Sequence, residues 1–177
     1  MRTTVDKIVE LDDRMFTVQQ LTKEYAKSNS DALLLIHNII PYVSWRRADL
    51  LSEISSTNVQ YVRKWELSYV ALQGDTIVGL LIAYERAPMT NHPFKAVYIH
   101  RLAIDPLFQG IGIGSSLVSY AIKQYRNVSP AVGFVSVQTN DEPRNSKVLS
   151  FYESLGFKKY MNVHYPDKLD VLMLLSQ

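Results

Sequence analysis

The sequence predicts an α/β fold of the α+β type, in which helices flank a mixed, mostly antiparallel sheet of about six or seven strands. Two observations carry this prediction. Helical patterns dominate the first third of the chain, and a run of segments rich in β-branched and aromatic residues then alternates with two further helical patterns. At 177 residues, the chain has the length of one domain. We therefore expect a single domain over residues 1–177, with a helical part over about 1–65 and a core over about 66–177.

The N-terminal part predicts one short strand, around residues 5–9, and three helices. An apolar stripe over residues 12–27 indicates the first helix, with Asp12 or Asp13 as its cap. Residues 30–40 indicate the second helix, which Pro41 ends. The third is expected over residues 44–55, with Ser44 as its cap.

In the core, the sequence predicts a run of strands followed by two helices that alternate with further strands. Gly74-Asp75 between two apolar runs is a hairpin signal. Asp105-Pro106 ends the strand that follows the hairpin, since proline cannot donate a ladder hydrogen bond. In order, the expected elements are strands over 69–72, 77–84 and 95–104, a helix to about 125, a strand over 131–139, a helix over 143–156, and strands over 157–165 and 168–176.

Composition excludes several functional classes. The net charge is only +2 and no basic cluster stands out, so we expect no nucleic acid as a partner. Apolar runs are too short to span a membrane, and the charged N-terminus is unlike a signal peptide, which favours a cytoplasmic protein without membrane contact. Cysteine is absent and the four histidines are scattered, so we expect no metal site.

A glycine-rich stretch, FQGIGIGSSLV, stands before the helical pattern that ends near residue 125. It holds three of the seven glycines of the chain. Helix N-termini bind anions, and glycine lets a phosphate approach the backbone closely. The dinucleotide fingerprint fails because Ser115 stands at its sixth position, and the nucleoside-triphosphate loop fails because no lysine follows Gly114. A tight turn that only packs the helix on a strand remains the alternative.

Two segments together resemble the GNAT superfamily of acyl-CoA-dependent N-acetyltransferases. RLAIDPLFQGIGIGSSLVSYAI is similar to its Q/R-x-x-G-x-G/A motif, with Gln109, Gly112 and Gly114 at the defining positions. NSKVLSFYESLGF resembles its N-x-x-A-x-x-x-Y-x-x-x-G-F motif, with Val148 where alanine is common. The resemblance covers about residue 69 to the C-terminus. It implies a GNAT-like sheet that splays open at the cofactor site.

The resemblance also implies an activity, the transfer of an acetyl group from acetyl-CoA directly to a primary amine. The pyrophosphate would bind the glycine loop, and the pantetheine arm would pair with the preceding strand. A non-catalytic acyl-CoA sensor or partner-binding module is the alternative, and Tyr152 argues against it. The residues that would bind acetyl-CoA are Leu102, Ala103, Ile104, Gln109, Gly110, Ile111, Gly112, Ile113, Gly114, Ser115, Asn145 and Tyr152.

Tyr152 matches the tyrosine of the family and would protonate the leaving thiolate. Asn145 would hydrogen-bond the cofactor arm or cap the helix. Strict alternation along the strand would put Tyr98, His100, Leu102 and Ile104 on one face. Some family members carry a glutamate base at the place of Tyr98, but this strand has no carboxylate.

The general base is therefore open on the sequence. His100 is a candidate, since its reference pKa is about 6.5. A histidine that is only hydrogen-bonded in the core is an equal alternative. A relay from Ser136 through water is a further alternative. Since many family members use only ordered water, the resemblance also allows a site without a single base.

The acceptor would be an amine of a small molecule or of a peptide, and we favour the small molecule. The C-terminal VHYPDKLDVLMLL nevertheless resembles members that acetylate protein N-termini. We expect the N-terminal helices, the loop 87–93 and the segment around His164 to form its pocket. Trp45, Arg46 and Arg47 would face this pocket and favour an acceptor that carries a carboxylate. Since many family members are dimers, a homodimer is compatible with the sequence.

Overall fold

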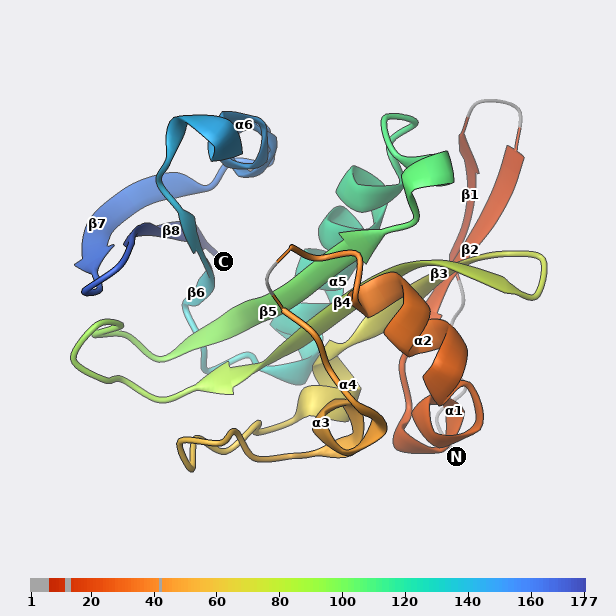
Figure 1. The fold of residues 1–177 in the computed structure, drawn as a ribbon, viewed down its shortest axis with the longest axis horizontal. Helices are drawn as coiled ribbons and strands as arrows, with labels where there is room; N and C mark the ends of the chain where they lie inside the picture. The colour runs from red at the N-terminus through yellow and green to blue at the C-terminus, as the bar shows by residue number, and fades with distance from the viewer. Residues whose placement is uncertain (1–6, 12–13, 42) are drawn as a thin grey trace.

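The computed structural model describes residues 7–11, 14–41 and 43–177. Its strands form one eight-stranded sheet in the order β1-β2-β3-β4-β5-β6-β8-β7 (Figure 1). The β5–β6 pair is parallel and the other neighbours in the sheet are antiparallel. The predicted mixed, mostly antiparallel sheet is therefore confirmed, with eight strands instead of six or seven.

The extra strand lies where the sequence predicted a helix over residues 12–27. Phe16 and Val18 alternate with more exposed neighbours, and Met15, which the helical stripe counted as apolar, is 55% exposed. Pairing with two neighbouring strands outweighs the helical pattern here. The proposed caps, Asp12 and Asp13, lie outside the described residues. The elements of this part are β1 (Lys7–Leu11), β2 (Arg14–Gln20), α1 (Lys23–Ser28), α2 (Ser30–His37), α3 (Arg47–Leu51) and α4 (Lys64–Leu67).

The core follows the predicted order closely. A 3-10 turn over Pro106–Phe108 precedes the glycine loop, and a second over Pro143–Asn145 precedes the last helix. Gly156 takes a φ of +92° just after that helix, as expected of a helix stop. The elements are β3 (Tyr69–Gln73), β4 (Thr76–Arg86), β5 (Ala96–Ile104), α5 (Ile113–Val128), β6 (Phe134–Asn140), α6 (Ser146–Ser154), β7 (Lys158–His164) and β8 (Leu169–Ser176).

The two faces of the sheet carry separate apolar cores. Helices α5 and α6 cover one face, where Leu117, Ala121 and Tyr125 of α5 are fully buried. The N-terminal helices cover the other face, with Leu33 of α2 and Leu50 of α3 fully buried there. Figure 1 shows α2 in front of the central strands and α5 behind them. The sheet thus separates the glycine loop, on the α5 side, from the N-terminal helices.

A β-bulge interrupts β5. Ile82 of β4 pairs with Arg101 and the next residue, Ala83, pairs with Ile99, so that His100 is an extra residue in β5. Tyr98 and His100 therefore lie among the aromatic rings on the N-terminal side, while Leu102 and Ile104 pack on the α5 side. The prediction that these four residues share one face is wrong, because the bulge reverses the alternation.

The sheet splays open just after this bulge. Residues 97–99 of β5 pair with residues 135–137 of β6, and this pairing ends there. Strand β6 then continues as the partner of β8 over residues 134–140. In Figure 1, β5 and β6 diverge toward α6. The gap leaves one edge of β5 over residues 100–104 without a strand partner, as the predicted splay requires.

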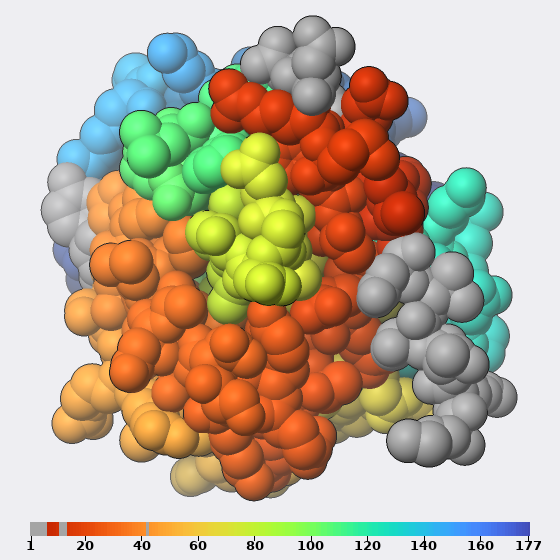
Figure 2. Space-filling model, turned by 90° about the vertical axis from the view of Figure 1, so that its right-hand side faces the viewer, coloured from red at the N-terminus to blue at the C-terminus, as the bar shows by residue number. Residues whose placement is uncertain are grey.

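The turn of the β3–β4 hairpin lies far from this gap. Figure 2 shows it on the surface, in yellow-green, between the β1–β2 hairpin in red and the N-terminal helices in orange. Gly74 of this turn has a φ of +56°, and a Cβ there would meet open space. Among the described residues, the helices are all too short or too polar to cross a membrane.

Candidate active site

Two adjoining cavities meet at the gap between β5 and β6. The glycine-loop pocket, of about 440 Å³, lies between the end of β5, the start of α5 and α6. The strand-gap pocket, of about 500 Å³, lies between β5, β6 and the segment Ile39–Pro41. Five residues line both cavities: Leu102, Ile104, Gln109, Val148 and Tyr152. A ligand that runs from one pocket into the other would therefore pass Leu102 and Tyr152.

The glycine loop presents free backbone donors to its pocket. Gly110 and Gly112 have φ values of +81° and +96°, and Gly112 caps the N-terminus of α5. The described residues provide no backbone acceptor for the N–H groups of residues 110–115. A Cβ at Gly110 would meet no atom within 4 Å. These donors and the positive end of the α5 dipole suit an anion such as a pyrophosphate.

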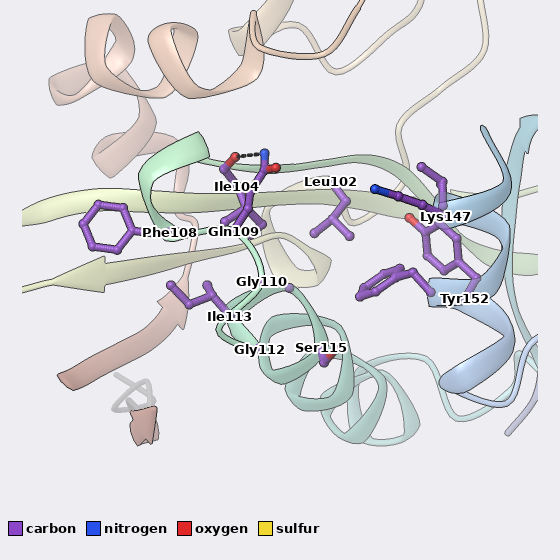
Figure 3. A pocket seen from close by; sticks show the side chains of 13 residues that line it. Leu102, Ile104, Phe108, Gln109, Gly110, Gly112, Ile113, Ser115, Lys147 and Tyr152 are labelled. Carbon is purple, nitrogen blue, oxygen red and sulfur yellow. Dashed lines mark hydrogen bonds between the residues drawn. The ribbon is translucent and has the colours of Figure 1, made fainter. Parts of the chain in front are cut away.

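Side-chain hydrogen bonds fix the loop against β5. Gln109 Nε2 donates to the carbonyl oxygen of Ile104 at 2.9 Å, and Asp105 Oδ1 accepts from the N–H of Leu107 at 2.9 Å. Figure 3 shows the loop on one side of the pocket and Tyr152 on the other, with Leu102 between them. The Gln109 side chain therefore holds the loop in place, while its backbone lies at the start of the donor array.

The structure gathers most of the residues that the sequence singled out. Ile111 is the exception, since it packs partly buried against the core and lines neither cavity. His100, Ala103 and Asn145 line the strand-gap pocket. The others line the glycine-loop pocket: Leu102, Ile104, Gln109, Gly110, Gly112, Ile113, Gly114, Ser115 and Tyr152.

Tyr152 of α6 is 5% exposed and borders both pockets. Burial raises the pKa of its phenol, and the neighbouring Tyr98 adds to the increase. The phenol therefore keeps its proton at neutral pH. A protonated phenol at the junction of the two cavities can act as a general acid.

Asn145 does not cap α6. It occupies the N-cap position, but its side chain makes no capping bond there. Instead, its Nδ2 donates to Thr139 Oγ1 at 2.8 Å and to the carbonyl oxygen of Asn140 at 2.6 Å. The capping alternative is therefore wrong. The side chain ties the start of α6 to the end of β6, at the edge of the strand-gap pocket.

His100 lies within a group of aromatic rings. Its ring centroid is 5.5–5.8 Å from those of Trp45, Tyr61, Tyr84 and Tyr98. Burial lowers its pKa well below the usual 6.5, and the charges of Arg101 and Lys64 lower it further. Its buried Nδ1 has no hydrogen-bond partner among the described residues. His100 is thus an unprotonated imidazole beside the strand-gap pocket.

Ser136, which the sequence offered as a relay through water, lies beside His92. His92 Nε2 lies 2.7 Å from Ser136 Oγ, and His92 Nδ1 lies 3.0 Å from the carbonyl oxygen of Phe94. If Nδ1 carries the proton that binds this carbonyl, Nε2 accepts from the serine hydroxyl. Both residues are fully buried and neither lines the two pockets. The pair connects the loop 87–93 to β6.

The expected arginines do not line the strand-gap pocket. Arg46 Nε pairs with Asp49 at 3.5 Å and its side chain is 87% exposed. Arg47 Nη2 donates to the carbonyl oxygen of Lys27 at 3.0 Å. The cation that does line this pocket is Arg101, which sequence reasoning missed because the bulge decides where it lies. Lys147, in the first turn of α6, was also missed and lines the glycine-loop pocket (Figure 3).

Comparison with known proteins gives relatives and structural neighbours. The chain is 32% identical to N-alpha-acetyltransferase 30 of Homo sapiens over 117 residues, which are 64% of this chain and 31% of that protein. The match thus spans about a third of the length of the human relative. The structure superposes on a NatC complex solved with a Gag peptide and CoA, with a TM-score of 0.70 and 19% identity, covering 92% of this chain and 98% of that one.

A second structural neighbour is Arabidopsis thaliana NAA60 in complex with acetyl-CoA. The TM-score is 0.67 at 14% identity, and the alignment covers 92% of this chain and 99% of that one. At such identities the two superpositions establish a shared fold. The family model for the acetyltransferase (GNAT) family matches residues 31–157, well over half of the chain. The chain therefore belongs to the acetyltransferase (GNAT) family.

Proposed function

We propose that this protein transfers the acetyl group of acetyl-CoA to a primary amine, namely the free α-amino group of a peptide or protein. The observation that carries the proposal is the splayed gap, which joins an anion-binding glycine loop to a second pocket past Leu102 and Tyr152. The relative named N-alpha-acetyltransferase 30 and the neighbour solved with a Gag peptide support a peptide acceptor over the small molecule that the sequence favoured.

The residues present fit acetyl-CoA on three counts. The N–H groups of residues 110–115 have no backbone acceptor among the described residues and can bind the pyrophosphate, and a Cβ at Gly110 would meet open space. The unpaired edge of β5 over residues 100–104 offers backbone groups to the amides of the pantetheine arm. Lys147 adds a positive charge to the lining of the pocket. Acetyl-CoA would supply a thioester, an activated acyl group, at the junction of the two pockets.

Side chains that line the two pockets divide the proton transfers between them. His100, unprotonated beside the strand-gap pocket, accepts a proton from the amine directly or through a water molecule. A backbone N–H group near Leu102, on the unpaired edge of β5, donates a hydrogen bond to the thioester carbonyl oxygen as negative charge develops on that oxygen. Tyr152 donates its proton to the departing sulfur.

A transfer assay tests this function. Purified protein is incubated with acetyl-CoA and a pool of synthetic peptides with free N-termini, and free thiol and peptide mass are followed. We expect thiol release that depends on peptide and an acetyl group on the α-amine. Peptides with a blocked N-terminus but a free lysine are the control and should stay unmodified. Binding of acetyl-CoA without transfer to any amine would favour the non-catalytic sensor instead. The cytoplasmic location and a homodimer stay predictions.

A further inference from the structure

Arg101 is a cation without a counter-ion among the described residues. Its Nη1 donates to the carbonyl oxygen of His100 at 2.8 Å, and its guanidinium lies over the ring of Trp45, 5.3 Å from the centroid. Its Nε is buried and has no hydrogen-bond partner among the described residues. The described carboxylates form no ion pair with it. A partly buried cation that no carboxylate balances costs folding free energy, so its presence in a pocket needs an explanation.

The surroundings of Arg101 are positive as well. Lys64 is 1% exposed, and its Nζ donates to the carbonyl oxygens of Leu50 and Ser52, at 2.6 Å each. Arg101, Lys64 and Arg86 all lower the pKa of His100 by their charge. Nearby carboxylates are already engaged: Asp49 by Arg46, Glu53 by Lys23, and Glu85 by Arg63 and Lys95. The described carboxylates therefore leave the charge of Arg101 to be balanced by solvent or by a ligand.

The location of Arg101 indicates which ligand would supply the balancing negative charge. Of the described residues that line the strand-gap pocket, Arg101 is the single charged one, and none of them is a carboxylate. Its neighbour in sequence, Leu102, lines both pockets at their junction. The phosphates of the donor would bind at the glycine loop, in the other pocket. An anion at Arg101 would consequently belong to the acceptor and lie only a few bonds from the reacting amine.

We propose that Arg101 selects acceptors that carry a carboxylate close to the amine. For a peptide this is an acidic side chain within the first two residues, and for a free amino acid it is the α-carboxylate. This inference rests on the proposed function and names its substrate class. A guanidinium suits the role because it binds carboxylates through two parallel hydrogen bonds and stays charged.

Paired acceptors test the inference. The pairs are peptides with glutamate or glutamine at the second position, and an amino acid and its amide, and kcat/KM is measured for each. We expect the wild-type protein to prefer the carboxylate by about tenfold, mainly through KM, with the preference shrinking at high salt. The pair that shows the larger preference identifies the source of the carboxylate. Equal rates in both pairs would overturn the inference and leave the proposed function intact.

Substitution at Arg101 locates the effect. R101Q should abolish the preference, so that the two acceptors of each pair react at similar rates, and R101K should retain part of it. Arg126→Gln, at an exposed arginine in the last turn of α5, is the matched control and should keep the preference. A preference that survives R101Q would contradict the assignment. If R101Q does not fold, the ratio of kcat/KM between the paired acceptors in the wild-type protein tests the inference without the variant.

Product binding separates the two hypotheses. If no acceptor is acetylated, the proposed function fails. Tryptophan fluorescence, to which Trp45 beside Arg101 contributes, then reports titration with N-acetylated peptides that carry glutamate or glutamine at the second position. Tighter binding of the glutamate peptide would support the carboxylate site without any catalysis. Equal binding of the two peptides would overturn it.

Discussion

At the scale of single residues, burial shifts the pKa values of Tyr152 and His100 in opposite directions. Burial disfavours the charged form of each group, so the phenol keeps its proton and the imidazole stays without one. Tyr152 and His100 approach the gap from opposite faces of the sheet. The pair thus offers an acid for the leaving sulfur and a base for the incoming amine.

Replacement of Tyr152 by phenylalanine tests the acid. Tyr152→Phe keeps the ring and removes the proton donor, so kcat should fall by about 100-fold while the Kd for CoA stays nearly the same. Steady-state kinetics and calorimetry measure the two quantities. Tyr160→Phe is the control, because Tyr160 is 51% exposed and lines neither pocket. An unchanged kcat in a folded Y152F protein would exclude this acid.

The pKa of His100 can be measured directly. In an NMR titration, with the resonance assigned through His100→Gln, the ring should titrate well below pH 6.5. Arg101→Gln removes a neighbouring positive charge, so it should raise that pKa. At a pH between the pKa of His100 in the folded chain and its pKa of about 6.5 in the unfolded chain, only the unfolded chain binds the proton. Stability should therefore fall as the pH drops below 6.5. A titration at or above pH 6.5 would contradict an unprotonated base.

At the scale of elements, the glycine loop was predictable from sequence and the bulge was not. Glycines at a helix start are a local signal, and two of them do take positive φ values. The bulge at His100 depends on how β5 pairs with β4, and alternation along one strand carries no trace of it. For the same reason, sequence reasoning missed Arg101. It also predicted a helix where β2 lies, because the apolar pattern of β2 fits both the helical and the strand period. Pairing with β1 and β3 decides between the two structures.

Two glycines allow a matched test of the loop. Gly110 and Gly74 both have positive φ and open space at the Cβ position, but only Gly110 lines the glycine-loop pocket. Gly110→Val and Gly74→Val should each lower the free energy of unfolding by about 1–3 kcal/mol through backbone strain. Gly110→Val alone should also weaken CoA binding, by at least about tenfold, because its side chain enters the phosphate space. Similar CoA affinities for the two folded variants would refute the role of the loop.

At the scale of the whole molecule, the sheet determines what the site can do. Among the described strands, β5 and β6 form the single parallel pair. Their pairing ends at residues 99 and 137, and both pockets open there. The α5 side of the sheet supplies the glycine loop and Tyr152, and the N-terminal side supplies His100, Trp45 and Arg101. The donor side carried two signature segments in the sequence. The acceptor side had no such motif, and its residues meet only through the tertiary fold.

Thermal unfolding with acetyl-CoA tests the central claim most directly. A ligand at about 100 times its Kd adds about 2.7 kcal/mol of stability, which is about 5–10 °C in Tm for a domain of this size. We predict such a shift with acetyl-CoA and with CoA, none with ATP or NAD, and a much smaller shift in Gly110→Val. Equal shifts with all four ligands, or none with acetyl-CoA, would contradict the account of the glycine loop as the acyl-donor site.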